Sequence, residues 1–119
     1  MKVTELRIGN WLDNGEGSNY VIDTSSMMDI LDEAQVNNGE TYWKPIPLTE
    51  EWLVKFGFDG RVDFKWKRNV GIQIVGGDYY FAFKDMGNVI FRSIVECKYV
   101  HQLQNLYFAV TREELELKP

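Results

Sequence analysis

The sequence contains one cysteine and one histidine among its 119 residues. A single thiol, Cys97, excludes an intramolecular disulfide, and this scarcity is typical of proteins from a reducing compartment. A structural zinc site needs four ligands, most often Cys and His side chains. Cys97 and His101 supply only two of them. We therefore predict no bound metal ion and no cofactor.

Long apolar runs are also missing. No stretch approaches the ~18 apolar residues of a membrane helix, and residues 1–7 contain no apolar run of signal-peptide length. We therefore expect a cytoplasmic protein without a membrane anchor. Basic residues are fewer than acidic ones: the chain has 13 Lys and Arg and 18 Asp and Glu, which gives a formal net charge of −5. This charge disfavours nucleic acid as a partner and suits a basic protein, including one that normally holds DNA.

What the chain does have is apolar and aromatic content. Hydrophobic residues make up 45 % of the chain and aromatic residues 14 %, which is too apolar for a disordered chain. The length is common for one domain, and no change in composition marks a boundary. We therefore predict a single domain over residues 1–119, of the α+β class.

The middle of the chain predicts an antiparallel meander. We expect four strands: residues 61–67, 70–75, 79–83 and 89–94. Short turns separate them, with Gly76-Gly77-Asp78 as the clearest hairpin signal. Short connections imply antiparallel neighbours. The first strand should lie near an edge, because its outward charges discourage further pairing.

Two helices and a β-rich N-terminal part complete the prediction. Thr49 should cap a short central helix that ends at Gly57. Apolar residues recur at helical spacing over residues 98–110, which predicts a C-terminal helix packed on the sheet. In the N-terminal part, residues 6–12 and 20–22 suggest strands. Residues 25–31 fit either a helix or a strand, and we favour a strand.

Three blocks of sequence stand out: LRIGNW (residues 6–11), PIPLTEEWLVKFGF (45–58) and YVHQLQNLYFA (99–109). Together they resemble a group of small uncharacterised proteins encoded by bacterial phages, prophages and mobile elements. The resemblance implies a phage or mobile-element origin. It implies no activity and transfers no functional residues.

The predicted C-terminal helix carries an unusual polar face. Its members are His101, Gln102, Gln104 and Asn105. Amides and an imidazole cost less to remove from water than full charges do, so such a face can enter an interface. We predict it as the binding face for a protein partner. The alternative is an ordinary face in contact with solvent.

A second candidate site is the aromatic run Tyr79 to Phe83. Its alternating rings suit a platform for single-stranded nucleic acid. Four cations could lie beside it: Lys65, Lys67, Arg68 and Arg92. The alternative is a strand whose rings are packed under a helix.

Catalysis is not favoured. A Cys97–His101 thiolate pair would lack an orienting third group, and Gly76-Gly77-Asp78 lies between strands instead of at the start of a helix, where phosphate binds. The leading hypothesis is a non-enzymatic protein-binding or accessory protein of phage or mobile-element origin. A single-strand nucleic-acid binder and a small enzyme of unknown class are the alternatives.

Overall fold

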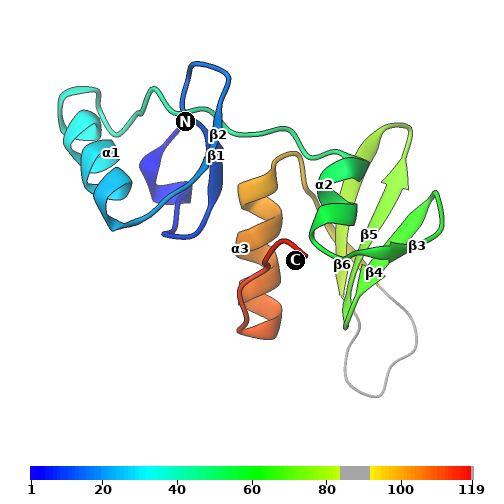
Figure 1. The fold of residues 1–119 in the computed structure, drawn as a ribbon. Helices are drawn as coiled ribbons and strands as arrows, with labels where there is room; N and C mark the ends of the chain where they lie inside the picture. Colours follow the sequence, from blue (N-terminus) through cyan, green and yellow to red (C-terminus); the bar gives the residue numbers. More distant parts are fainter. Residues whose placement is uncertain (84–91, 119) are drawn as a thin grey trace. The chain divides into compact units, whose positions relative to one another are not determined.

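A computed structural model describes residues 1–83 and 92–118, with the backbone alone for residues 92–94 (Figure 1). Helices occur together with antiparallel strands, which confirms the α+β class. The chain divides into two compact units. Unit 1 comprises Met1–Pro47 and Tyr99–Asn105, and unit 2 comprises Leu48–Lys98 and Leu106–Pro119. The assignment of residues 1–119 to a single domain stays a prediction.

Unit 1 is built from short elements around a small core. Its elements are the 3-10 helix η1 (Val3–Glu5), the strands β1 (Trp11–Asp13) and β2 (Asn19–Val21), the helix α1 (Thr24–Val36) and the first half of α3 (Val100–Thr111). The two strands form an antiparallel hairpin. Leu12, Ile22 and Ile30 are fully buried, with Leu6 and Met27 among the side chains packed against them. The core therefore joins the hairpin to α1 and to the chain after η1.

The favoured strand over residues 25–31 is wrong, because these residues lie inside α1. The helix begins at a capping box. The Asp23 carboxylate accepts the backbone N–H of Ser26 (2.8 Å), and the Ser26 hydroxyl accepts the N–H of Asp23 (2.9 Å). This reciprocal pair satisfies backbone donors that a helix start leaves open. The expected strand 6–12 is also shorter, because Gly9 has a φ of 99° in a turn ahead of β1.

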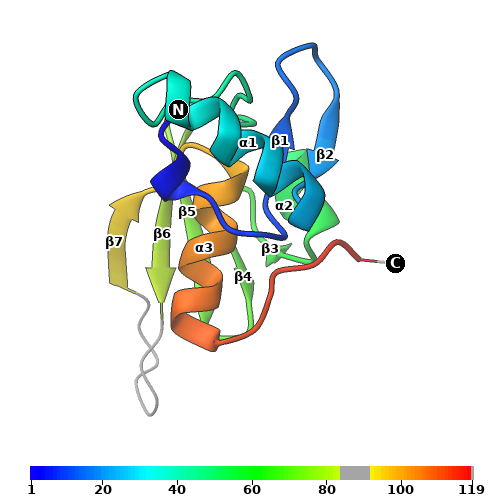
Figure 2. The same ribbon diagram turned by 90° about the vertical axis from the view of Figure 1, so that its left-hand side faces the viewer.

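Within the described residues, unit 2 contains a five-stranded antiparallel sheet in sequential order. Its strands are β3 (Asp59–Gly60), β4 (Phe64–Lys67), β5 (Val70–Val75), β6 (Asp78–Phe83) and β7 (Arg92–Glu96). The meander is confirmed, with β3 as an additional short strand. β4 lies next to the edge, as expected, and β7 forms the other edge (Figure 2). Gly76 and Gly77, with φ of 57° and 87°, make the tight β5–β6 turn. The turn predicted at residues 85–88 and the start of the fourth strand, residues 89–91, lie outside the described residues.

Both predicted helices are present. α2 (Glu50–Lys55) begins where the Thr49 hydroxyl accepts the N–H of Trp52 (3.4 Å), and Gly57 follows its end with a φ of 90°. In the second half of α3, Tyr107 is buried with its ring centroid 6.5 Å from that of Phe58. The Lys67 ammonium of β4 lies 5.7 Å from the same Tyr107 ring. The C-terminal helix therefore contacts the sheet within unit 2, as predicted.

Candidate functional site

Gln104 of α3 binds the loop before β1. Its side-chain amide donates to the Gly9 carbonyl (2.9 Å), and its oxygen accepts the backbone N–H of Trp11 (2.8 Å). The side chain is 1 % exposed, and Asn10 between its two partners is fully buried. Buried backbone groups need hydrogen-bond partners. Gln104 therefore satisfies one backbone donor and one backbone acceptor at the start of β1.

Asn105 continues this connection within unit 1. Its side-chain oxygen accepts from the Asn10 amide (2.9 Å) and from Arg7 Nε (2.8 Å), while its amide donates to the Glu5 carbonyl (2.9 Å). Arg7 also donates to the Gln104 carbonyl (3.3 Å). We call Arg7, Asn10, Gln104 and Asn105 the amide cluster. Its hydrogen bonds connect the first half of α3 to residues 5–11.

His101 lies one turn before this cluster and is 1 % exposed. Among the described residues, neither ring nitrogen has a hydrogen-bond partner. Nε2 lies 3.5 Å from a carboxylate oxygen of Glu5, which is a distance for ionic attraction and a poor one for a hydrogen bond. The Tyr99 ring stacks on the imidazole at a centroid distance of 6.0 Å. Burial lowers the pKa of His101 more than Glu5 raises it, so the neutral imidazole is favoured.

These contacts change the interpretation of the polar helix face. The expectation that it lies at the surface is wrong for His101 and Gln104, which are buried. Asn105 and Gln102 are half-buried, and the Gln102 side chain accepts the N–H of Tyr99 at the start of α3 (3.2 Å). Three of the four side chains bond to backbone within unit 1. The physical reason is that irregular chain around β1 leaves backbone groups for amides to satisfy.

The lysines of the second candidate site make local contacts in unit 2. Lys67 donates to the Phe56 carbonyl (2.7 Å), and burial lowers the pKa of its ammonium. Lys65 donates to the Arg61 carbonyl (3.3 Å). Arg68 forms an ion pair with Glu113. Arg92 lies in β7.

The aromatic strand β6 is largely a core strand. Phe81 is 1 % exposed and pairs in register with the buried Ile72. Strand alternation puts Lys65, the β4 partner of Ile72, on this same face. Cations and rings therefore share a face, but its central ring is not available for stacking. Trp66 is 44 % exposed and lies on the opposite face.

Helix α1 presents a different kind of surface. We define the α1 surface by five residues: Met28, Asp29, Leu31, Asp32 and Val36. All are exposed, and the three apolar side chains are 61, 46 and 80 % exposed. The helical repeat keeps them together, because Ile30 and Ala34 occupy the buried side. No Lys or Arg occurs between Thr24 and Val36. The surface is therefore acidic and apolar at once.

The negative charge of the chain is concentrated in unit 1, which contains α1. Unit 1 contains three Lys and Arg residues against eight Asp and Glu residues, whereas unit 2 contains ten of each. The whole formal charge of −5 therefore belongs to unit 1. An acidic surface of this kind attracts basic partners over distances of about a Debye length, ~8–10 Å at physiological salt.

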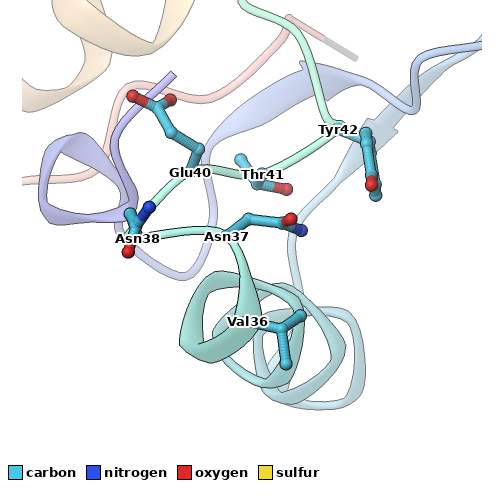
Figure 3. A pocket seen from close by; sticks show the side chains of 6 residues that line it. All are labelled: Val36, Asn37, Asn38, Glu40, Thr41 and Tyr42. Carbon is cyan, nitrogen blue, oxygen red and sulfur yellow. The ribbon is translucent and has the colours of Figure 1, made fainter.

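An open hollow of about 350 Å³ lies at the end of α1 (Figure 3). Its lining residues are Val36, Asn37, Asn38, Glu40, Thr41 and Tyr42. Glu40 accepts from the N-terminal ammonium (2.7 Å) and pairs with Lys2 (3.3 Å), and these bonds lower the pKa of its carboxyl group. Tyr42 is 71 % exposed. The hollow extends the α1 surface beyond Val36.

In the described part of the chain, no group of three or more His, Cys, Asp or Glu side chains is placed to hold a metal ion. Cys97 is buried and lies before α3, which begins at Val100. Among the described residues, no helix is long and apolar enough to cross a membrane.

We compared the chain with known protein families, curated proteins and solved structures. Neither a family model, nor a curated protein, nor a solved structure matches the chain.

Proposed function

We propose that the chain is a non-enzymatic binding protein whose α1 surface takes a basic, partly apolar segment of another protein. The observation that carries the proposal is the exposure of Met28, Leu31 and Val36 on a helix whose charged residues are all acidic. A helix needs one apolar side to join its core, and α1 already has that side in Ile30 and Ala34.

The energetics favour a partner that combines both properties. Covering exposed apolar side chains contributes about 25 cal/mol per Å² of surface removed from water. Asp29 and Asp32 lie between these side chains and steer positive charge towards them, which raises the association rate. A basic segment with apolar residues at helical or strand spacing matches both features. A purely apolar partner would leave the carboxylates without partners.

A phage or mobile-element origin, which we propose from the resemblance, would narrow the choice of partner protein. The three sequence blocks of the chain resemble proteins encoded by phages and mobile elements, and we propose a host or phage protein as the target. A protein that normally holds DNA has a suitable surface, because it presents Lys and Arg to phosphate. By occupying that surface, the acidic unit 1 would compete with nucleic acid.

The proposal is tested by photo-crosslinking from two positions. A photoreactive amino acid replaces Leu31 on the α1 surface, or Val62 in unit 2 as a matched control that is 81 % exposed. Each protein is irradiated in nuclease-treated bacterial lysate, and the crosslinked peptides are identified by mass spectrometry. We expect a Lys- and Arg-rich peptide of one protein to crosslink from position 31 and not from position 62.

Charge reversal supplies the second arm. Asp32→Lys should abolish the crosslink from position 31, whereas Asp63→Lys, at a side chain that is 73 % exposed in unit 2, should leave it unchanged. Equal crosslinking from positions 31 and 62 would contradict the proposal. So would crosslinked peptides without basic residues, or a crosslink that forms in untreated lysate but not in nuclease-treated lysate.

A further inference from the structure

His101 is the only histidine of the chain and is almost completely buried. Its ring nitrogens lack hydrogen-bond partners among the described residues, although buried polar groups are nearly always bonded. Along α3 it also lies between Tyr99, whose backbone N–H is accepted by the Gln102 side chain, and Gln104 of the amide cluster. A change in the charge of His101 therefore occurs next to the hydrogen bonds that connect α3 to residues 5–11.

We propose that protonation of His101 in mildly acidic solution releases the first half of α3 from residues 5–11. The inference concerns the interior of unit 1 and stands whether or not the α1 surface binds a partner. The hydrogen bonds of the amide cluster then depend on pH, because the protonation state of one imidazole determines whether they remain formed.

The titratable groups that the structure places at the imidazole are Glu5 of η1 and Tyr99. Glu5 attracts an imidazolium, but its side chain is 45 % exposed, so solvent weakens that attraction. Burial opposes the charge more strongly. A protonated ring gains hydration by moving outwards, and such a movement pulls α3 from its partners.

The direction of the pH dependence follows from the lowered pKa. We call the state with the amide cluster formed the closed state, and the state in which α3 is released from residues 5–11 the open state. The open state binds the proton more readily, because its imidazole has the ordinary pKa of about 6.5. The closed state is therefore fully favoured above this pH and loses stability as the pH falls through it. The loss levels off below the pKa of the closed state. Each unit between the two pKa values corresponds to about a tenfold change in the opening equilibrium.

The test uses the whole chain and its single imidazole. NMR of histidine-labelled protein gives the pKa of His101 directly, without overlap from a second histidine. Hydrogen exchange of the Trp11 amide, which Gln104 accepts, reports whether the amide cluster is closed. We expect the imidazole to titrate below about 6.5, and exchange at Trp11, corrected for the intrinsic rate, to rise as the pH falls from about 7.5 to 5.5.

Two variants separate a switch from a structural role. His101→Leu cannot take up a proton, so exchange at Trp11 should lose its pH dependence. Glu5→Gln removes the stabilising carboxylate and should lower the imidazole pKa further. If His101→Leu fails to fold, the measurements on the unmodified chain still decide. An imidazole that titrates at or above its ordinary pKa, or Trp11 exchange that is unchanged while the imidazole charges, would overturn the proposal.

Discussion

The side-chain oxygen of Gln104 accepts the backbone N–H of Trp11 at 2.8 Å, across 93 positions of the chain. The same side chain donates to the carbonyl of Gly9, so one residue of α3 satisfies two groups beside β1. Both groups belong to unit 1, as do residues 99–105 of the chain. The pair of bonds explains why a neutral amide occupies this position, since a carboxylate or an ammonium could serve only one of the two groups.

Removing this side chain should destabilise the fold strongly. We expect Gln104→Ala to lower the free energy of unfolding by about 2–4 kcal/mol, because a buried donor and a buried acceptor lose their partner. Gln35→Ala is the matched control, since Gln35 is exposed on α1 and should change the value by less than about 0.5 kcal/mol. Urea unfolding followed by tryptophan fluorescence gives both values. Similar losses in the two variants would mean that the amide cluster does not stabilise unit 1.

The two sides of α1 should respond differently to truncation. Ile30 is fully buried, and Ile30→Ala should cost about 2–4 kcal/mol of unfolding free energy through lost contacts and a residual cavity. Leu31→Ala should change stability by less than about 0.5 kcal/mol, because Leu31 is exposed on the α1 surface. Urea unfolding of the two adjacent variants makes the comparison. A large loss at Leu31 would show that this side chain is covered by the chain itself.

The start of α1 should loosen in acid. Hydrogen bonds from Ser26 hold the pKa of the Asp23 carboxyl below its ordinary value of 3.8. The unfolded chain therefore binds this proton more readily, so the stabilising effect is full above the ordinary pKa and is lost as the pH falls through the folded one. Carboxyl-detected NMR of the folded chain should show Asp23 titrating below its ordinary pKa of 3.8. A higher pKa for Asp23 would contradict the capping box.

A glycine beside β4 should be sensitive to a single added methyl group. At Gly60, with a φ of 143°, a Cβ would meet the Phe64 carbonyl oxygen at 2.6 Å and the Trp66 ring at 2.7 Å. We expect Gly60→Ala to destabilise the chain by about 1–3 kcal/mol more than Gly17→Ala. Gly17 is a matched control, because its φ is 91° and nothing lies within 4 Å of an added Cβ. Thermal unfolding of both variants checks the difference, and equal midpoints would contradict the close approach of Trp66.

The sequence was most informative where local chemistry decides the structure. Thr49 and Gly57 mark the ends of α2 through backbone groups only a few residues away, and Gly76-Gly77 marks a two-residue turn. The strand at Phe64–Lys67 has the same local origin, but the expectation that its charges point outwards is wrong for Lys65, which lies on the face of the buried Ile72 while Trp66 is 44 % exposed on the other face. The favoured strand over residues 25–31 failed for a related reason. The decisive cap is the reciprocal pair of Asp23 and Ser26, and Asp23 lies outside residues 25–31.

The role of the polar helix face could not be read from its own residues. Amides at Gln104 and Asn105 are compatible with solvent, with a partner or with another part of the chain. Only the fold brings them to Gly9, Asn10 and Trp11, more than ninety positions away. Likewise, exposed Met28 and Leu31 become unusual only once Ile30 and Ala34 are seen to form the buried side of the helix.

The most direct test of the proposed function is the affinity of the partner crosslinked at position 31 for charge-reversed variants of the chain. Isothermal titration calorimetry would compare the unmodified chain, the double variant Asp29→Lys with Asp32→Lys, and the unit 2 control Asp63→Lys. We predict about a tenfold loss of affinity for the double variant, because two weak attractions become repulsions of similar size, and no loss for the control. Equal affinities for all three proteins would contradict a binding role for the α1 surface.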